Sequence, residues 1–173
     1  VINLYFPEKK ISFTIQHEQK GISHALMSAK EFVASGDTVF FILGDNFFQF
    51  SPIMNIKMND LIKNRGAYIF SYKVNNPEEF GVAELDADNN VVSIEEKPKN
   101  PKTNNAVVGV YIYDDSVMEK IKTLKPSARG EYEVTDLNNL YIAEGTCKNI
   151  TLSGWWVDAG TPDRILELES KLS

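Results

Sequence analysis

Residues 38–46 read T-V-F-F-I-L-G-D-N, a run of large apolar residues that stops abruptly at Gly-Asp-Asn. A run this short and this apolar is typical of a central parallel strand that is buried on both faces. Gly44 then frees the backbone, and Asp45 is expected at the carboxyl end of that strand. Ligands of open α/β sheets bind at this edge. A carboxylate in that position suits a metal ion that itself holds phosphates.

Strand and helix patterns alternate along the rest of the chain. Further strands are predicted at residues 11–16, 67–74, 81–84, 91–95, 106–113, 148–152 and 155–157. Helices are predicted at residues 21–33, 52–63 and 115–124, together with one that Thr135 would cap and a last one opened by Thr161 and Pro162. The alternation predicts an α/β fold in which helices flank a mixed, mostly parallel sheet.

The composition limits the class of protein. The chain has 173 residues, of which 43% are hydrophobic, and this suits a single domain over residues 1–173 with one substantial core. It contains no apolar run of about 18 residues, so we expect no membrane span. It contains no basic segment followed by an apolar stretch, so we expect no secretory signal.

Charge and cysteine content bear on partners and location. The net charge of −6 argues against a nucleic acid polymer, because binding a phosphate backbone needs clustered Lys and Arg. A nucleotide is still compatible, since it needs only a few local cations or a metal. The lone Cys147 cannot form an internal disulfide. It therefore fits a reducing compartment, and we expect the cytoplasm.

A second carboxylate of interest, Asp158, lies in G-W-W-V-D-A-G-T-P, where a predicted strand ends just before a capped helix. Like Asp45, it is an acid at a strand terminus beside a small residue. Two such acids, far apart in sequence, could converge on one Mg²⁺ ion. Mg²⁺ typically takes one or two carboxylates and fills its remaining positions with phosphate oxygens and water. The alternative is that each acid is a turn or N-cap aspartate.

The segment E-E-K-P places Glu96 and Lys97 next to each other. Neighbouring side chains on a strand point to opposite faces, so these two could share a site only if the strand ends there. Pro98 favours such an end. The carboxylate could then accept sugar hydroxyls and the ammonium could neutralise a phosphate. The alternative is a solvated run of charges.

Three more residues are candidates for ligand contacts. Arg129, in S-A-R-G-E-Y-E-V-T-D, could reach a phosphate with its fork of donors, and the alternative is an arginine on a surface loop. Gln16 ends a predicted strand and faces Gly21 across a short loop. Its amide can both donate to and accept from a pyrimidine edge, and the glycine lets a ligand approach the backbone closely.

Taken in order, these segments resemble a known family. The series Q-H-E-Q-K-G-I-S-H-A, L-G-D-N, F-G-V, E-E-K-P, N-N-A-V-V-G-V-Y-I-Y-D, A-R-G-E-Y-E-V-T-D-L-N and W-V-D-A-G-T is similar to the sugar-1-phosphate nucleotidyltransferases. Within that family the chain most resembles the glucose-1-phosphate thymidylyltransferase group in its shorter form. The similarity runs from about residue 11 to about residue 168, which is nearly the whole chain.

The resemblance implies a role for each candidate and a reaction. The implied roles are Mg²⁺ binding for Asp45 and Asp158, recognition of the pyrimidine base for Gln16 and Gly21, sugar contacts for Gly81, Glu96 and Val107, and binding of the sugar's phosphate for Lys97 and Arg129. The implied reaction is attack of a glucose-1-phosphate oxygen on the α-phosphorus of dTTP, which gives dTDP-glucose and pyrophosphate. The resemblance also allows a homo-oligomer.

The chain departs from the family pattern at two places. Relatives begin with a strand and a Gly-rich loop of the G-x-G-T-R-L type, followed by a K-P segment, and that loop wraps the triphosphate. This chain starts at Val1 without such a segment, so we expect an N-terminally truncated domain that is inactive or nearly so by itself. Ala159 also stands where close relatives usually carry Thr.

Three alternatives to a thymidylyltransferase remain open. The first is a uridylyltransferase that uses UTP and a hexose-1-phosphate, because UTP and dTTP present the same base edge. The second is a binding module without catalysis, because the loop that wraps the nucleotide is missing. The third is a nucleotide-sugar-dependent glycosyltransferase, but such enzymes usually show an Asp-x-Asp pair, and Phe47 follows Gly-Asp-Asn here.

Overall fold

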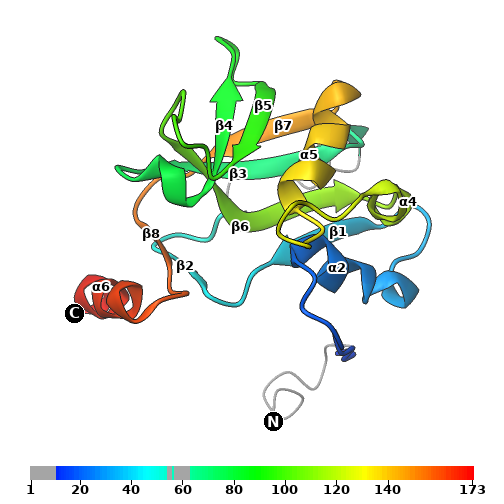
Figure 1. Ribbon diagram of the computed structural model, residues 1–173, viewed down its shortest axis with the longest axis horizontal. Coiled ribbons are helices and arrows are strands. Elements are labelled where there is room, and N and C mark those ends of the chain that lie inside the picture. Colours follow the sequence, from blue (N-terminus) through cyan, green and yellow to red (C-terminus); the bar gives the residue numbers. More distant parts are fainter. Residues whose placement is uncertain (1–10, 54–55, 57–62) are drawn as a thin grey trace.

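The structure, a computed structural model, describes residues 11–53, 56 and 63–173 (Figure 1). Its described helices are α2 (Ile22–Met27), α4 (Val117–Thr123), α5 (Val134–Ala143) and α6 (Pro162–Leu172), with 3₁₀ turns η1 (Lys30–Phe32) and η2 (Pro77–Glu79). Its described strands are β1 (Thr38–Ile42), β2 (Asn46–Phe48), β3 (Ala67–Lys73), β4 (Gly81–Leu85), β5 (Val91–Glu96), β6 (Asn105–Asp114), β7 (Cys147–Thr151) and β8 (Trp156–Asp158).

Strand β6 lies at the centre of a six-stranded sheet. The strand order is β5-β4-β6-β3-β7, and β1 also pairs with β6. The strands β1, β3 and β4 all run antiparallel to β6. The pair β3 and β7 is parallel, with Ala67 beside Cys147. Figure 1 shows β6 crossing the middle of the molecule between β1 and β3.

The prediction of a mixed sheet flanked by helices is confirmed, but among the strands that the structure describes the sheet is not mostly parallel. Within that part of the chain β3 and β7 are the one parallel pair. The error came from interpreting short apolar runs as parallel strands. An apolar run indicates only that both faces of a strand are covered, and β6 meets that condition while it runs antiparallel to three neighbours.

Alternate side chains of β6 enter two different hydrophobic clusters. Tyr111 and Tyr113 belong to the cluster that α2, α4 and α5 cover, where Leu26, Ile121 and Leu137 are also buried. These helices lie along one side of the sheet in Figure 1. The intervening residues Val108, Val110 and Ile112 join Phe70, Phe80 and Trp156 in the second cluster. The chain therefore has a core on each face of its sheet.

The strand β1 is not the doubly buried central strand that its sequence predicts. It pairs only with β6 among the described strands, its residues are half-buried, and the side chain of Ile42 is 52% exposed. The prediction placed the most apolar run at the centre. The longer run of β6, which is flanked by β1, β3 and β4, takes that place instead.

Two predicted elements near the N-terminus differ from the structure. Residues 11–16 form no strand, and Phe13 and Ile15 within them are largely exposed. The helix predicted at residues 21–33 is divided into α2 and η1. Ser28 follows α2, and its hydroxyl and its amide both donate to the His24 carbonyl, a back-bonding that slightly destabilises a helix. Most of the helix predicted at residues 52–63 lies outside the described residues.

A two-stranded antiparallel ribbon, β2 with β8, lies beside the sheet. The sequence predicted a strand at the position of β8 but none at that of β2. Its register pairs Asn46 with Asp158 and Phe48 with Trp156. Trp156 lies within the second cluster, 5.3 Å from the ring of Phe80 between centroids. The predicted start of the last helix is observed, since α6 begins at Pro162. None of the described helices has the length and apolarity that crossing a membrane requires.

We predict that the thiol of Cys147 is inert in the folded chain. Its residue is 6% exposed on β7, and burial raises its pKa to about 12. The thiolate is the reactive form, so a raised pKa lowers reactivity at neutral pH. A disulfide reagent at pH 8 should label the native protein far more slowly than the same protein in guanidinium. Equal labelling rates in the two conditions would contradict this burial.

Candidate active site

A cavity of about 290 Å³ opens where β5, β6, the start of α5 and the β2–β8 ribbon meet. Six of the nine candidate residues line it: Gly81, Glu96, Lys97, Val107, Arg129 and Asp158. They come from five separate segments of the chain, and the packing of the sheet, α5 and the β2–β8 ribbon brings them together. The lining also includes Asn46, Glu131, Glu133 and Thr135, none of which was a candidate.

Asp45 and Asp158 lie next to each other at the edge of this cavity. The β2–β8 register places Asn46 opposite Asp158, and the Ala159 amide donates to the Asp45 carbonyl at 2.8 Å. A Cβ placed on Gly160 would lie 3.2 Å from Asp158 Oδ1 and 3.8 Å from Asp45 Oδ2. The two carboxylate oxygens are therefore no farther apart than these distances combined. The ribbon thus brings together two acids that are distant in sequence.

Asn46 connects this acid pair to the protein interior. Its side-chain Nδ2 donates to Asp45 Oδ1 at 2.9 Å. Its Oδ1 accepts from the Gly109 amide at 2.9 Å and from Trp156 Nε1 at 2.8 Å. Gly109 has no room for a side chain, because a Cβ there would lie 2.7 Å from Asn46 Nδ2. Asn46 therefore orients Asp45 from a position fixed by β6 and β8.

Glu96 and Lys97 line the same cavity because β5 ends at Glu96. Glu96 Oε2 accepts from the hydroxyl of Thr135 at 2.7 Å. Lys97 has a φ of 44°, in the left-handed region that is uncommon outside glycine, and its amide donates to the Phe80 carbonyl. Strain of this kind concentrates at functional sites. The bend at Lys97 lets two consecutive charged side chains contribute to one cavity.

Thr135 was predicted to cap a helix, and this is wrong. The helix α5 begins at Val134 with Glu133 in the N-cap position, so Thr135 lies within the first turn. It is buried, and its hydroxyl serves Glu96 instead of the helix end. A threonine before an apolar repeat resembles a cap in sequence, and only the tertiary contact with β5 distinguishes the two roles.

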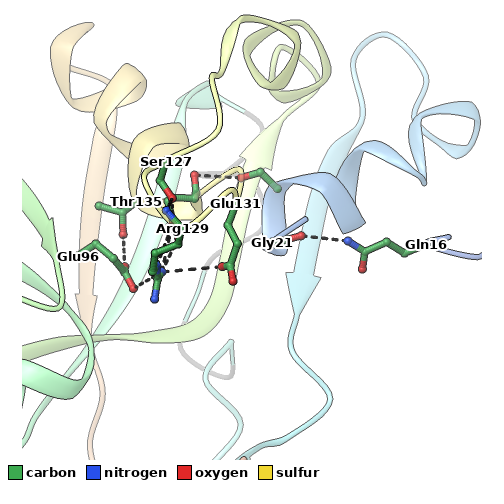
Figure 2. Close-up of polar contacts among 9 residues, drawn as sticks. Gln16, Gly21, Glu96, Ser127, Arg129, Glu131 and Thr135 are labelled. Atoms are coloured by element: carbon green, nitrogen blue, oxygen red, sulfur yellow. Dashed lines mark hydrogen bonds and ion pairs between the residues drawn. The ribbon is translucent and has the colours of Figure 1, made fainter. Parts of the chain in front are cut away.

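The guanidinium of Arg129 lies among three carboxylates (Figure 2). Its Nη2 is 2.9 Å from Glu133, 3.3 Å from Glu96 and 3.9 Å from Glu131. The hydrogen bond to Glu133 is the main reason that the pKa of Arg129 is raised, so the cation stays charged. Among these contacts, sequence reasoning missed Glu131 and Glu133, although the position of Glu133 within E-Y-E-V-T, four residues after Arg129, is compatible with an ion pair.

Gln16 and Gly21 do not line the cavity themselves, but they lie on the chain that leads into α2, where the next residue, Ile22, is part of the lining (Figure 2). Gln16 Nε2 donates to the Gly21 carbonyl at 3.2 Å and lies 3.0 Å from His24 Nδ1. Gly21 has a φ of 92°, and a Cβ there would lie 2.8 Å from the carbonyl oxygen of Tyr132. Glycine is thus required at this position for packing against the segment that carries Arg129.

The fold and the cavity together define a class of protein. A pair of acids lies at one end of the β2–β8 ribbon beside a mixed α/β sheet, and Glu96, Lys97 and Arg129 line the adjacent cavity. Carboxylates suit a hard cation, and lysine and arginine side chains can bind a phosphate. Residues 6–173 match the nucleotidyl transferase family, and the chain belongs to that family.

Comparison with named proteins shows which members of the family this chain resembles. The chain is 39% identical over 163 residues to a glucose-1-phosphate thymidylyltransferase of Neisseria gonorrhoeae, covering 93% of this chain and 56% of that protein. A crystal structure of a candidate glucose-1-phosphate thymidylyltransferase from Bacillus anthracis, in complex with sucrose, is 40% identical. It aligns with a TM-score of 0.83 over 92% of this chain and 64% of that one. The resemblance found in the sequence is confirmed.

A more distant structure supports the fold alone. A UDP-glucose pyrophosphorylase complexed with UDP-glucose is 20% identical and aligns with a TM-score of 0.80, covering 93% of this chain and 65% of that one. The chain spans about half the length of the curated relatives that it matches, as its 56% share of the Neisseria protein shows.

We predict that Asn46→Ala destabilises the fold by about 2 to 4 kcal/mol, because it leaves two buried donors, the Gly109 amide and Trp156 Nε1, without their acceptor. Urea unfolding followed by circular dichroism measures this change. Asn100→Ala, at an exposed loop position, is the control and should leave the midpoint unchanged. An Asn46→Ala midpoint equal to that of the control would show that Asn46 does not connect β2 to the core.

Proposed function

We propose that the intact protein transfers a thymidylyl group from dTTP to glucose-1-phosphate, which gives dTDP-glucose and pyrophosphate. The observation that carries this proposal is the arrangement of the acid pair, Asp45 and Asp158, at the edge of the cavity that Glu96, Lys97 and Arg129 line. The identity to named thymidylyltransferases supports the choice of nucleotide and sugar.

The charge balance of the cavity supports a divalent cation as cofactor. Its lining contains five carboxylates, from Glu79, Glu96, Glu131, Glu133 and Asp158, and two cations, from Lys97 and Arg129. Two phosphate-bearing substrates would add further negative charge to an already negative site. Asp45 and Asp158 offer the hard oxygen ligands that Mg²⁺ prefers, and Mg²⁺ takes one or two carboxylates with phosphate oxygens completing its shell. When bound, Mg²⁺ would offset the charge of the triphosphate.

The sugar is proposed to lie against Glu96 in the space that Gly81 and Val107 leave. Thr135 donates to Glu96 Oε2 and so fixes the orientation of the carboxylate. A Cβ on Gly81 would lie 3.3 Å from both Glu96 Oε2 and Thr135 Oγ1, so a side chain there would crowd the same oxygen. A fixed carboxylate that borders open space can accept hydrogen bonds from sugar hydroxyls.

The chain's own groups then align the acceptor for the reaction. Lys97 and Arg129 hold the phosphate of glucose-1-phosphate, whose oxygen attacks the α-phosphorus of dTTP in line with the departing pyrophosphate. That phosphate is already ionised at neutral pH, so no protein side chain has to remove a proton from it. The protein contributes position and compensating charge, and this requires no covalent nucleophile.

Gln16 and Gly21 are proposed to read the pyrimidine, and UTP is the alternative donor. Both nucleotides present the same edge at N3 and O4, so an amide alone does not separate them. We also propose a cytoplasmic location, which the single buried thiol of Cys147 supports.

The reaction is tested with the full-length protein, glucose-1-phosphate, Mg²⁺ and each common nucleoside triphosphate in turn, by measuring pyrophosphate release. Release with dTTP, exceeding release with UTP, is the expected result. No release with any nucleotide would reject the proposed reaction, and a clear preference for UTP would replace the donor. Removal of Mg²⁺ with EDTA should stop release, and added Mg²⁺ should restore it.

We predict that Asp45→Asn and Asp158→Asn each lower turnover at least about a hundredfold, because each removes one charge from the acid pair. Both substitutions keep the shape of the side chain. Asp88→Asn, in the exposed turn between β4 and β5, is the matched control and should keep the turnover of the unmodified protein. Unchanged turnover in both acid-pair variants would remove the metal assignment while leaving the reaction itself to be judged by pyrophosphate release.

A further inference from the structure

Glu133 makes the closest contact with Arg129. Arg129 donates from Nε to Glu133 Oε1 at 3.1 Å, and from Nη2 to Oε1 and Oε2 at 2.9 Å each. Within the described part of the chain, the contacts of this guanidinium all use Nε and Nη2. One edge of the guanidinium is therefore occupied by Glu133, and Nη1 has no partner in the described structure.

Glu133 differs from the other two carboxylates around Arg129 in how firmly it is held. Its side chain is 11% exposed, against 28% for Glu96 and 43% for Glu131. Ser127 Oγ donates to Glu133 Oε1 at 2.7 Å, and the Glu133 carbonyl accepts from the buried hydroxyl of Ser23 at 3.2 Å. The residue also directly precedes α5, whose first residues are buried. Glu133 is thus anchored to the fold.

The loop that carries Arg129 is organised by the same serine. The Arg129 amide donates to Ser127 Oγ at 3.2 Å, and the Ser127 amide donates to the Glu131 carbonyl at 2.8 Å. The Gly130 amide closes the turn on the Ser127 carbonyl, and Gly130 has a φ of 76°. Ser127 therefore contacts both the backbone of Arg129 and the carboxylate that holds its side chain.

We propose that Glu133 is a positioning residue, which holds Arg129 by Nε and Nη2 so that Nη1 is presented to the phosphate of the sugar phosphate. This inference rests on the proposed function, since it needs a phosphate at Arg129. An unrestrained arginine loses rotamer entropy when it is ordered. Glu133 imposes that order before the substrate arrives, so binding a phosphate requires less further ordering.

The negative charge of Glu133 also repels a phosphate. A test of the positioning role therefore has to keep this charge and change only the position of the carboxylate. Glu133→Asp keeps the charge but withdraws the carboxylate by one methylene. We expect it to weaken binding of glucose-1-phosphate about tenfold, the effect of losing roughly one charge-assisted hydrogen bond. Calorimetry on the full-length protein without nucleotide measures this, with inorganic phosphate as a second ligand.

Glu84→Asp is the matched control for this change. Glu84 Oε2 also accepts from a serine hydroxyl, that of Ser93 at 3.1 Å, and from a cation, Lys102 at 3.0 Å, but it lies outside the cavity lining. This variant should bind glucose-1-phosphate like the unmodified protein. In turnover assays Glu133→Asp should raise KM for the sugar phosphate more than it lowers kcat, as loss of a contact made throughout the reaction does.

Two further variants make the outcomes decisive. Ser127→Ala changes no charge and removes the hydroxyl that holds Glu133, so it should weaken binding about threefold even if Glu133→Asp proves unstable to heating. Unchanged binding in either folded variant would overturn the positioning role. Arg129→Ala separates this inference from the function it rests on. Unchanged binding of glucose-1-phosphate in Arg129→Ala would refute the assignment of Arg129 to the phosphate. If Arg129→Ala binds more weakly but Glu133→Asp binds normally, only the role of Glu133 is refuted.

Discussion

The antiparallel pairing of β6 with three neighbours is the interaction on which the rest of the structure depends. Its C-terminal half pairs with β1, which leads directly to Asp45. β3 pairs with β6 along nearly its whole length, and the N-terminal end of β6 also pairs with β4, the strand that begins at Gly81 and pairs with β5. β6 itself supplies Val107 and Gly109 to the cavity. Because β6 is buried on both faces, these neighbours are held in one fixed arrangement around the site.

The positions of most elements could be predicted from the sequence, because apolar spacing and turn residues are local signals. The hairpin of β4 and β5, the strand β6 and the start of α6 follow this pattern. Strand direction and rank within the sheet could not be predicted in the same way. The run in β1 is as apolar as that of a central strand, yet β1 is only half-buried. Its position in the sheet depends on which other strands pair with β6, and the local sequence of β1 does not contain that information.

The candidate site shows the same division. A sequence motif can suggest that a charged side chain binds a ligand, as it did for Asp45, Glu96, Arg129 and Asp158. The structure places these residues around one cavity or at its edge. The residues that orient them could not be found from local sequence. Asn46 acts through a glycine on β6 and a tryptophan on β8, and Thr135 acts on a strand 39 positions away. Such contacts exist only after the sheet and α5 have packed.

The ribbon of β2 and β8 has a consequence for the order in which the protein folds. It joins Asn46 to Trp156, which are 110 positions apart in the chain, through only three residue pairs. Closing a loop of that length costs about 4 kcal/mol of chain entropy. Three residue pairs alone do not offset this cost, so the ribbon also depends on the packing of Trp156 in the core. We therefore expect the acid pair to form after the sheet. A cation that needs both acids can bind only the folded chain, so its binding free energy adds to the free energy of unfolding.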